Sequence, residues 1–294
     1  MNTANHQFPD SLGYTPTVEA DVSSALTEDI GPGDLTAALV AESQQAKAMV
    51  LTREDTVLCG RAWFDEVFRQ LDPSVKVEWF AAEGERVSAD TKLCVITGPA
   101  RPILSGERSA LNFLQFLSAV ASCAAEYAEA VAHTNAKILD TRKTIPGLRL
   151  AQKYAVTVGG ASNHRVGLYD AILIKENHIV AAGTIAKAVA AARAQNPGVI
   201  CEVEVENLAE AEAGMRAEAD RLLLDNFTHT QLKEAVKLRN EIAPMISLEA
   251  SGGVDLTTAK EIAECLVDFI SVGKLTKDIS AIDLSMRFKL LEES

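Results

Sequence analysis

The sequence lacks two features that would each indicate a familiar class of partner. It has no excess of positive charge, because 28 Lys and Arg residues stand against 41 Asp and Glu, a formal net charge of −13. Nucleic acids require broad basic surfaces, so this acidic chain argues against a nucleic-acid partner. It also has no apolar run that approaches the roughly 20 residues of a membrane span. We therefore expect neither nucleic acid nor a membrane as partner.

Cysteine is scarce and widely spaced. The odd count argues against a disulfide framework, and the absence of any CxxC argues against zinc. We expect reduced thiols in a cytoplasmic protein. Cys201 could be a nucleophile, but a buried structural thiol is favoured, since free cysteine is among the most buried residue types. The five positions are Cys59, Cys94, Cys123, Cys201 and Cys265.

The first part of the chain, residues 1–117, mixes helices with short strands. Its start has neither the basic beginning nor the apolar core of a signal peptide, so we expect residues 1–15 to be a loose tail. Helices are predicted at VEADVSSALTEDI, at 63–70 and from Gly106 onward, where GERSALNFLQFLSAVASCAAEYAEAV has helical spacing. GPGDLT reads as a turn. Strands are predicted at AKAMVLTRE, TVLCG, VKVEWF and TKLCVITG.

From Lys137 the pattern changes to an alternation of strands and helices. It predicts a parallel sheet with helices outside it, and a second domain over 118–294 whose last roughly 18 residues pack back on the first. Six strands are fewer than a full eightfold barrel needs, so an incomplete α/β barrel and an open doubly wound sheet both fit. The strands are KILDT, AILIKEN, VICEVEVEN, RLLLDN, MISLEAS and FISVG; the helices are LRLAQKYAVTV, TIAKAVAAARAQN, LAEAEAGMRAEA, TQLKEAVKLRNEI and TAKEIAECL.

Positive charge is concentrated after the first of these strands. Residues 140–178 hold six Lys and Arg but three acids, a net +3 that leaves −16 for the rest of the chain. Three of the cations lie in LDTRKTIPGLR, residues 139–149. Segregation of this kind is typical of a local anion-binding site on an acidic protein.

Ionisable groups or glycines close nearly every predicted strand, at the edge where parallel α/β folds form their sites. In EVEVE, alternation places Glu202, Glu204 and Glu206 on one face. If helices cover the sheet, these carboxylates need cations, a metal or hydrogen-bond donors. The alternative is an edge strand with one solvated face. Natural partners are the cations at 142, 143, 165 and 175.

Three further features have a structural alternative beside the functional one. Lys175 could form a Schiff base, clamp an anionic substrate, or make a structural ion pair with Glu204; the density of other cations favours the clamp. His164 and Arg165 follow GGASN in a loop, and the sequence supports a binding-site role and a structural role for them equally. Short glycine turns at SGGV, 251–254, and VGK, 272–274, can hold a phosphate on backbone N–H groups.

The chain contains, in this order, EDIGPGDLT, CG near position 59, GERSALNF, LDTRKTIPGLR, KYAVTVGGASNHRVGLYDAILIKENHI, EVEVEN, LLLDNF, EASGGV and ISVGKLTK. In these motifs and their order it resembles the quinolinate phosphoribosyltransferase family over nearly its whole length. The resemblance implies an N-terminal open α/β sandwich, a C-terminal incomplete α/β (TIM-like) barrel and a homodimer whose active sites combine both subunits.

The resemblance also implies a reaction: quinolinate and phosphoribosyl pyrophosphate give nicotinate mononucleotide, pyrophosphate and carbon dioxide, with Mg²⁺, in NAD synthesis. It implies roles for matching residues, with Lys143, Lys175, Glu204 and Asp225 as the catalytic set. Glu204 and Asp225 would also face the ribose hydroxyls and the metal. Arg108, from the neighbouring subunit, would bind quinolinate together with Thr141, Arg142, Lys143, His164 and Arg165. The 5′-phosphate would lie on Ser251, Gly252, Gly253, Val272, Gly273 and Lys274, the last at a usually small position.

Three rival functions stay open at this point. Lys175 could form the Schiff base of a lyase, but the many cations suited to binding carboxylates argue against this function. A related phosphoribosyltransferase could act on nicotinate, which needs fewer carboxylate holders. A non-catalytic metabolite-binding protein would not require acids at 204 and 225 beside the cations.

Overall fold

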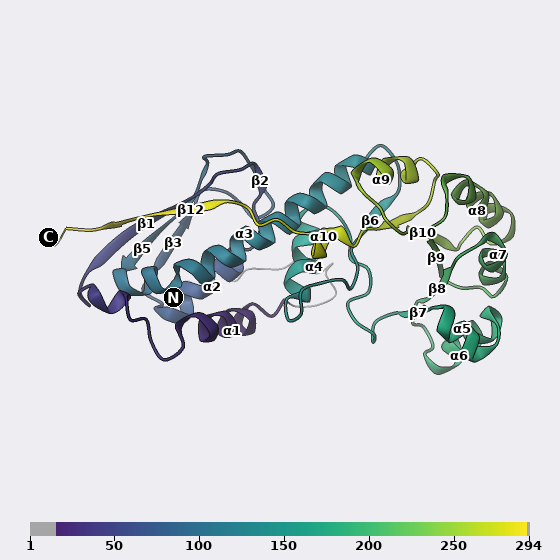
Figure 1. Ribbon diagram of the computed structural model, residues 1–294, viewed down its shortest axis with the longest axis horizontal. Helices are drawn as coiled ribbons and strands as arrows, with labels where there is room; N and C mark the ends of the chain where they lie inside the picture. The colour runs from purple at the N-terminus through teal and green to yellow at the C-terminus, as the bar shows by residue number, and fades with distance from the viewer. Residues whose placement is uncertain (1–15, 293–294) are drawn as a thin grey trace. The chain divides into compact units, whose positions relative to one another are not determined.

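The computed structural model describes residues 16–292, so the tail expected over residues 1–15 lies outside the described residues. The chain divides into two compact units (Figure 1). Of the described residues, the first comprises 16–125, a return segment at Ile145–Gly160 and 278–292. The second comprises Glu126–Thr144 and Ala161–Lys277.

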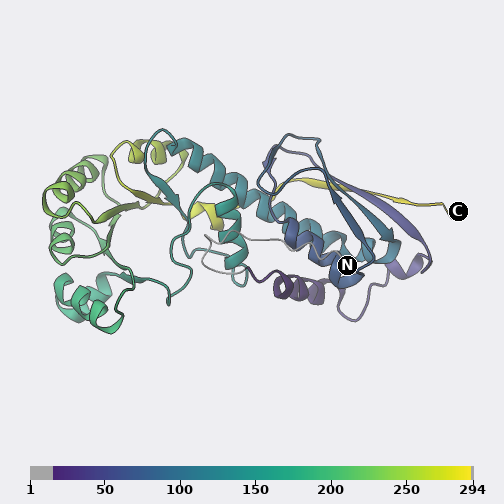
Figure 2. The same ribbon diagram turned by 180° about the vertical axis from the view of Figure 1, so that it is seen from behind.

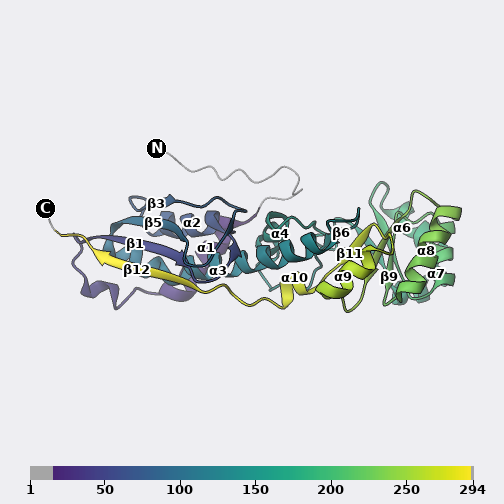
Figure 3. The same ribbon diagram turned by 90° about the horizontal axis from the view of Figure 1, so that it is seen from above.

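The first unit contains a four-stranded antiparallel sheet in the spatial order β12, β1, β5, β3. The last strand of the chain pairs with the first along nearly all its length, as Figure 3 shows. This pairing places the C-terminal segment in the first unit. The strands are β1 (Gln45–Thr52), β3 (Lys76–Trp79), β5 (Lys92–Pro99) and β12 (Leu284–Leu290), with β2 (Thr56–Val57) and β4 (Arg86–Val87) as a small separate pair.

Helices complete the first unit. α2 buries Trp63, Phe64 and Phe68 almost completely, as its amphipathic pattern predicts. α3 begins before the expected Gly106, because a proline at position 102 is tolerated in a first helical turn. The helices are α1 (Val18–Ile30), the 3₁₀ turn η2 (Ala37–Leu39), α2 (Arg61–Leu71), α3 (Ala100–Val131) and α4 (Arg149–Val158).

α4 differs from the expectation of an uninterrupted second domain over 118–294, because it belongs to the first unit. Tyr154 on α4 donates to Glu83 Oε1 at 3.0 Å. At the end of α4, Gly159 packs so closely on α3 that an added Cβ would lie 2.2 Å from the carbonyl oxygen of Ala121. The helical pattern of α4 was read correctly, but its packing partner could not be read from periodicity.

The second unit contains a six-stranded parallel sheet in the spatial order β6, β11, β10, β9, β8, β7. Figure 2 shows these strands inside an arc of helices. Within the described residues β6 and β7 are the two edges, so the expected incomplete α/β barrel is confirmed. The strands are β6 (Lys137–Leu139), β7 (Ile172–Ile174), β8 (Cys201–Val205), β9 (Arg221–Asp225), β10 (Ser247–Ser251) and β11 (Phe269–Ser271).

One helix replaces part of a predicted strand. AILIKEN was expected to be extended, but β7 stops at Ile174 and a helix begins at Glu176. His178 accounts for the change, because its Nδ1 accepts the backbone N–H of Lys175 at 3.0 Å and closes the first turn. No helix within residues 16–292 is both long and apolar enough to cross a bilayer. The helices are α5 (Glu176–Ala182), α6 (Ile185–Gln195), α7 (Leu208–Arg216), α8 (His229–Ile242), α9 (Leu256–Ala263) and α10 (Lys274–Lys277).

The two faces of β8 have opposite chemistry. Val203 and Val205 are fully buried, whereas Glu202 and Glu204 occupy the alternate positions. β8 pairs with both β7 and β9, so the alternative of an edge strand is wrong. Carboxylates therefore point from a central strand into the interior of the barrel, and each requires a specific partner.

Candidate active site

The carboxyl ends of the parallel strands carry most of the predicted site residues. Glu204 lies one residue before the end of β8, and Asp225 and Ser251 end β9 and β10. Asp225 and Ser251 are paired in register. Because parallel strands end at the same edge, these residues line one edge of the second unit, which we call the rim.

Two acids and two lysines interact at the rim. Lys175, which follows β7, forms an ion pair with Glu204 through Nζ and Oε2. Burial raises the pKa of Asp225, and the Glu204 carboxylate raises it further, while Lys175, a hydrogen bond from Asn226 and Lys143 lower it. Each of these influences requires proximity, so residues from four separate segments meet here.

Two arginines bring like charges together near the same rim. Burial lowers the pKa of Arg165, and the neighbouring charge of Arg142 lowers it further, while the carboxylates of Glu202 and Asp170 raise it. Arg165 also donates from Nη1 to the carbonyl oxygen of Ala171 at 3.1 Å, which fixes one side of its guanidinium. Two crowded guanidiniums create a strong local preference for an anion, and a carboxylate matches their fork geometry.

A buried aspartate builds the segment that carries one of these arginines. Asp140 is fully buried at the end of β6, where its Oδ1 accepts the backbone N–H of His164 at 2.8 Å. Its Oδ2 accepts the side-chain amide of Asn163 at 2.7 Å. Ser162 also bridges to Leu139, so the segment runs parallel to β6. The aspartate therefore acts as a structural clamp at the rim.

Thr141 and Lys143 form a tight turn after β6. The backbone N–H of Lys143 donates to Thr141 Oγ1 at 3.1 Å, and the Lys143 carbonyl oxygen accepts from Thr276 Oγ1 at 2.9 Å. The Lys143 side chain crosses Gly273, with Cδ 3.1 Å from the place a Cβ would occupy there. A side chain at position 273 would therefore displace this lysine.

Two glycine-containing turns lie at the ends of β10 and β11. Gly252 has φ +107°, and an added Cβ would lie 2.1 Å from Oδ1 of Asn226, so the position requires glycine. Val272 is buried and its N–H donates to the carbonyl oxygen of Leu139, so this amide serves the sheet. Lys274 is exposed at the start of α10. Phosphate binding by these turns stays a prediction.

Below the rim, three ionisable side chains form a buried cluster. Nε2 of His164 lies 2.9 Å from Oε2 of Glu202 and 3.4 Å from Oε2 of Glu249. Both glutamates are buried, on β8 and β10. The cations at 142, 143, 165 and 175 were expected to pair with the carboxylates of β8. Lys175 pairs with Glu204 as expected, and Arg165 interacts electrostatically with Glu202, whose hydrogen-bond partner is His164. Sequence reasoning gave Glu249 and Asp140 no role, because their partners are more than 20 residues away along the chain.

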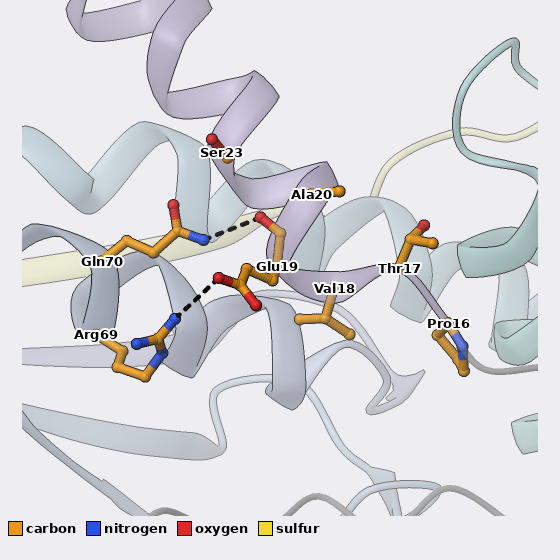
Figure 4. Close-up of a pocket in the computed structure, with 8 residues that line it drawn as sticks. All are labelled: Pro16, Thr17, Val18, Glu19, Ala20, Ser23, Arg69 and Gln70. Atoms are coloured by element: carbon orange, nitrogen blue, oxygen red, sulfur yellow. Dashed lines mark hydrogen bonds and ion pairs between the residues drawn. The ribbon is translucent and has the colours of Figure 1, made fainter.

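Arg108 lies elsewhere, on an exposed position of α3 in the first unit. That unit also has a surface hollow at the start of α1, drawn in Figure 4. There Gln70 Nε2 donates to the carbonyl oxygen of Glu19 at 3.0 Å, and Arg69 lies 4.0 Å from the Glu19 carboxylate. None of the predicted site residues lines this hollow.

Cys201 is fully buried on β8. Burial raises the pKa of its thiol, so the reactive thiolate is disfavoured. The interpretation of Cys201 as a buried structural thiol is confirmed.

Comparisons with known proteins decide the family. Residues 34–118 match the quinolinate phosphoribosyl transferase N-terminal domain, and residues 120–287 match the C-terminal domain of the same family. The chain belongs to the quinolinate phosphoribosyl transferase family. The two matches cover both units described above, apart from the ends of the chain.

Relatives in distant organisms resemble the chain over nearly its full length. A probable nicotinate-nucleotide pyrophosphorylase [carboxylating] of Synechocystis is 39% identical, and the match covers 89% of each chain. The human nicotinate-nucleotide pyrophosphorylase [carboxylating] is 39% identical over 92% of this chain and 91% of its own. The structure of the nicotinate-nucleotide pyrophosphorylase from Francisella tularensis has a TM-score of 0.89 and 42% identity, and covers 96% of this chain and 98% of that one.

A second enzyme class shares only the fold. The structure of human nicotinic acid phosphoribosyltransferase is 14% identical with a TM-score of 0.63, covering 89% of this chain and 74% of that one. The family membership therefore rests on the two domain matches and on relatives 39% identical that are named as carboxylating pyrophosphorylases.

Proposed function

We propose that the chain transfers the phosphoribosyl group of phosphoribosyl pyrophosphate to quinolinate, with loss of carbon dioxide, in NAD synthesis. The products are nicotinate mononucleotide and pyrophosphate. One observation supports this most strongly: Arg142 follows β6, and Arg165 follows His164, whose backbone Asp140 holds at the end of β6. Glu204 and Asp225 lie at the ends of β8 and β9 of the same parallel sheet. The cations suit a dianionic substrate, and the acids suit a developing positive charge on a sugar.

Quinolinate would be held by its two carboxylates. Arg142 and Arg165 offer planar forks for bidentate contacts, and Lys143 offers a point charge beside them. Thr141 adds a hydroxyl to the turn that carries Lys143. Ser251, Gly252, Gly253, Gly273 and Lys274 would hold the 5′-phosphate, with Val272 supporting the turn from the core.

Mg²⁺ would be held by Glu204 and Asp225, partly through the substrate. The two carboxylates lie close enough for Glu204 to raise the pKa of Asp225, which is the crowding that a divalent cation relieves. When bound, the ion neutralises charge on the leaving pyrophosphate. The carboxylates themselves bind the ribose hydroxyls and stabilise positive charge on the ribose ring.

The bond changes follow from these positions. The bond from ribose C1 to pyrophosphate breaks, the ring develops oxocarbenium character, and the quinolinate nitrogen forms the new bond to C1. The pyridinium then accepts the electron pair released when the C2 carboxylate leaves as carbon dioxide. Lys143 and Lys175 stabilise the resulting carbanion until C2 takes up a proton. The nitrogen attacks through its lone pair, so this step needs no general base.

The rival functions fit the geometry less well. A Schiff-base lysine must be desolvated and neutral, whereas Lys175 is exposed and ion-paired with Glu204. A transferase acting on nicotinate binds one carboxylate, which does not account for two crowded guanidiniums. A metabolite-binding protein has no use for carboxylates placed to stabilise a sugar cation.

We also propose a cytoplasmic homodimer with shared active sites. In this arrangement Arg108 of one subunit binds a quinolinate carboxylate in the site of its neighbour. Its exposed position on α3 is compatible with such a role. Light scattering after size exclusion measures the mass of the assembly, and a monomer at enzymatic concentrations would exclude a shared site.

The assay of the proposed function measures all products together. The protein is mixed with Mg²⁺, phosphoribosyl pyrophosphate and quinolinate labelled in its C2 carboxylate. We expect equal amounts of labelled carbon dioxide, pyrophosphate and nicotinate mononucleotide. Mononucleotide formed from nicotinate but not from quinolinate would instead support the related transferase.

A further inference from the structure

The cluster of His164, Glu202 and Glu249 inside the barrel carries a large desolvation cost, which indicates a specific role. Both carboxylates are almost completely shielded from water, and buried charge is unfavourable unless it is paired and hydrogen-bonded. The two acids come from β8 and β10 and both point at the same ring nitrogen, Nε2. Two separate strands therefore supply acceptors for one imidazole edge.

The other ring nitrogen is engaged as well. The backbone N–H of Arg165 donates to Nδ1 of His164 at 2.7 Å. Direct hydrogen bonding from His164 to a substrate carboxylate would require one ring nitrogen to leave its present partner. The geometry thus favours an indirect role, in which the ring fixes the backbone of the residue that follows it.

The two ring nitrogens respond differently to protonation. Burial lowers the pKa of His164, but the hydrogen bonds and charges of Glu202 and Glu249 outweigh it and raise the pKa to about 9. The bond from Arg165 N–H requires a lone pair on Nδ1, so it opposes this protonation. In either state the N–H at Nε2 points toward the carboxylates, whereas the link to the Arg165 backbone requires the neutral ring with its proton on Nε2.

Further contacts hold Glu249 in place. Its Oε1 accepts a hydrogen bond from Ser271, and its Oε2 accepts from Arg221 Nη1 at 3.1 Å. Arg221 in turn lies over the Phe269 ring, 4.1 Å from its centroid. Oε1 of Glu202, by contrast, is buried without a hydrogen-bond partner among residues 16–292. An unpaired buried carboxylate oxygen costs stability.

We propose that Glu202 and Glu249 are positioning residues of the quinolinate pocket. They hold the Nε2 edge of His164 inside the barrel, and the imidazole fixes the backbone of Arg165 so that its guanidinium meets a substrate carboxylate. On the other side of the segment, Asp140 holds the backbone N–H of His164. The segment is thus held by a side-chain clamp at both ends. This inference rests on the proposed function, because it gives Arg165 its substrate.

The same three side chains have the donor types of a metal site, and their ligand atoms lie within 4.8 Å of one another. The surroundings favour the hydrogen-bonded cluster instead. Both oxygens of Glu249 already accept from protein donors, and one of those donors, Arg221, is a cation that would repel a metal ion.

The test compares Glu202→Gln with Glu241→Gln, a control on an exposed glutamate of α8. Glu202→Gln removes a desolvated charge, so we expect no fall in melting temperature. We expect the quinolinate KM to rise about tenfold, the effect of replacing a charge-assisted hydrogen bond by a weaker neutral one, with the KM for phosphoribosyl pyrophosphate unchanged. The control should match the wild type in all three quantities.

A second variant and a spectroscopic readout keep the test decisive. Ser271→Ala removes one donor to Glu249 without changing any charge, and should raise the quinolinate KM in the same selective way. In nitrogen-15 spectra the Nε2–H of His164 should exchange slowly in the wild type and faster, at a shifted resonance, in Glu202→Gln, because a neutral amide oxygen is a weaker acceptor than a carboxylate.

Three results would overturn the positioning role. They are an unchanged quinolinate KM in Glu202→Gln, a parallel rise of both KM values with a lower melting temperature, and a stoichiometric metal ion that His164→Asn removes. Failure of the proposed function is a separate result, because the wild type in the same assay would then form no mononucleotide from quinolinate.

Discussion

Replacing Arg165 by alanine should weaken quinolinate binding strongly while changing stability little. In the unliganded protein, Arg142 lowers the pKa of Arg165 while Glu202 and Asp170 raise it, so removal of this guanidinium relieves repulsion from one cation and forfeits part of the attraction to two carboxylates. The variant also loses the hydrogen bond from Nη1 to the Ala171 carbonyl oxygen, which is worth about 1 kcal/mol. These effects differ in sign, and we expect a small net change in the free energy of unfolding.

The loss of Arg165 has no such offsetting gain in the binding of quinolinate. The contact of Arg165 with a substrate carboxylate is charge-assisted and worth about 1.5–3 kcal/mol, which corresponds to a rise in KM of roughly 10- to 150-fold. Arg165→Lys keeps the charge but loses the planar fork, so its KM should lie between the wild type and the alanine variant. Initial rates are measured against quinolinate at saturating phosphoribosyl pyrophosphate and Mg²⁺, with melting temperatures recorded in parallel. An unchanged quinolinate KM in Arg165→Ala would refute the assignment.

Three further predictions concern the assembly and the scaffold. Inactive Arg108→Ala and Lys175→Ala variants, mixed and allowed to exchange subunits, should regain part of the activity; a mixture that stays inactive after verified exchange argues against shared sites. Gly159→Ala places a Cβ against the Ala121 carbonyl oxygen and should lower the free energy of unfolding by about 1–3 kcal/mol in urea titrations, whereas an unchanged midpoint would mean that α4 is not packed there. Hydrogen bonds from the backbone N–H of Ala37 and the Ser105 hydroxyl lower the pKa of Asp34. The ionised carboxylate therefore stabilises the fold above its unfolded pKa of about 3.9, and this stabilisation is lost as the pH falls through the lower pKa of the folded state. Asp34→Asn should therefore have a lower free energy of unfolding than the wild type at neutral pH, and the two values should converge in acid. A difference that is constant with pH would contradict this.

Local patterns in the sequence predicted most of the elements. The alternation in EVEVE placed Glu202 and Glu204 on one face of a strand, and the full burial of Val203 on the other face confirms it. The six predicted strands of the second domain all form. Periodicity succeeds here because alternate burial is a property of each strand alone.

Packing partners and strand ends were harder to predict. The helix α4 was recognised, but its place in the first unit depends on the contact between Gly159 and Ala121, which no local pattern encodes. The short helix α5 was missed because the side chain that closes its first turn belongs to His178, and histidine is not a common capping residue. Both errors arose from side-chain and packing contacts that local helix and strand propensities do not describe.

The site was predicted in its residues more fully than in its connections. The concentration of cations indicated Arg142 and Arg165 as anion binders, since charge segregation is visible in composition. The pairing of Glu202 with His164 was not visible, because it depends on the segment before His164 lying along β6. The sequence thus indicated which charges matter, whereas the fold determines which carboxylate serves which cation.

The location of bound quinolinate tests the central claim most directly. A crystal structure of the protein with quinolinate should show its carboxylate oxygens within hydrogen-bond distance of the guanidiniums of Arg142 and Arg165, with the ring nitrogen directed toward Glu204 and Asp225. Quinolinate bound elsewhere, with both arginines facing bulk water, would contradict it.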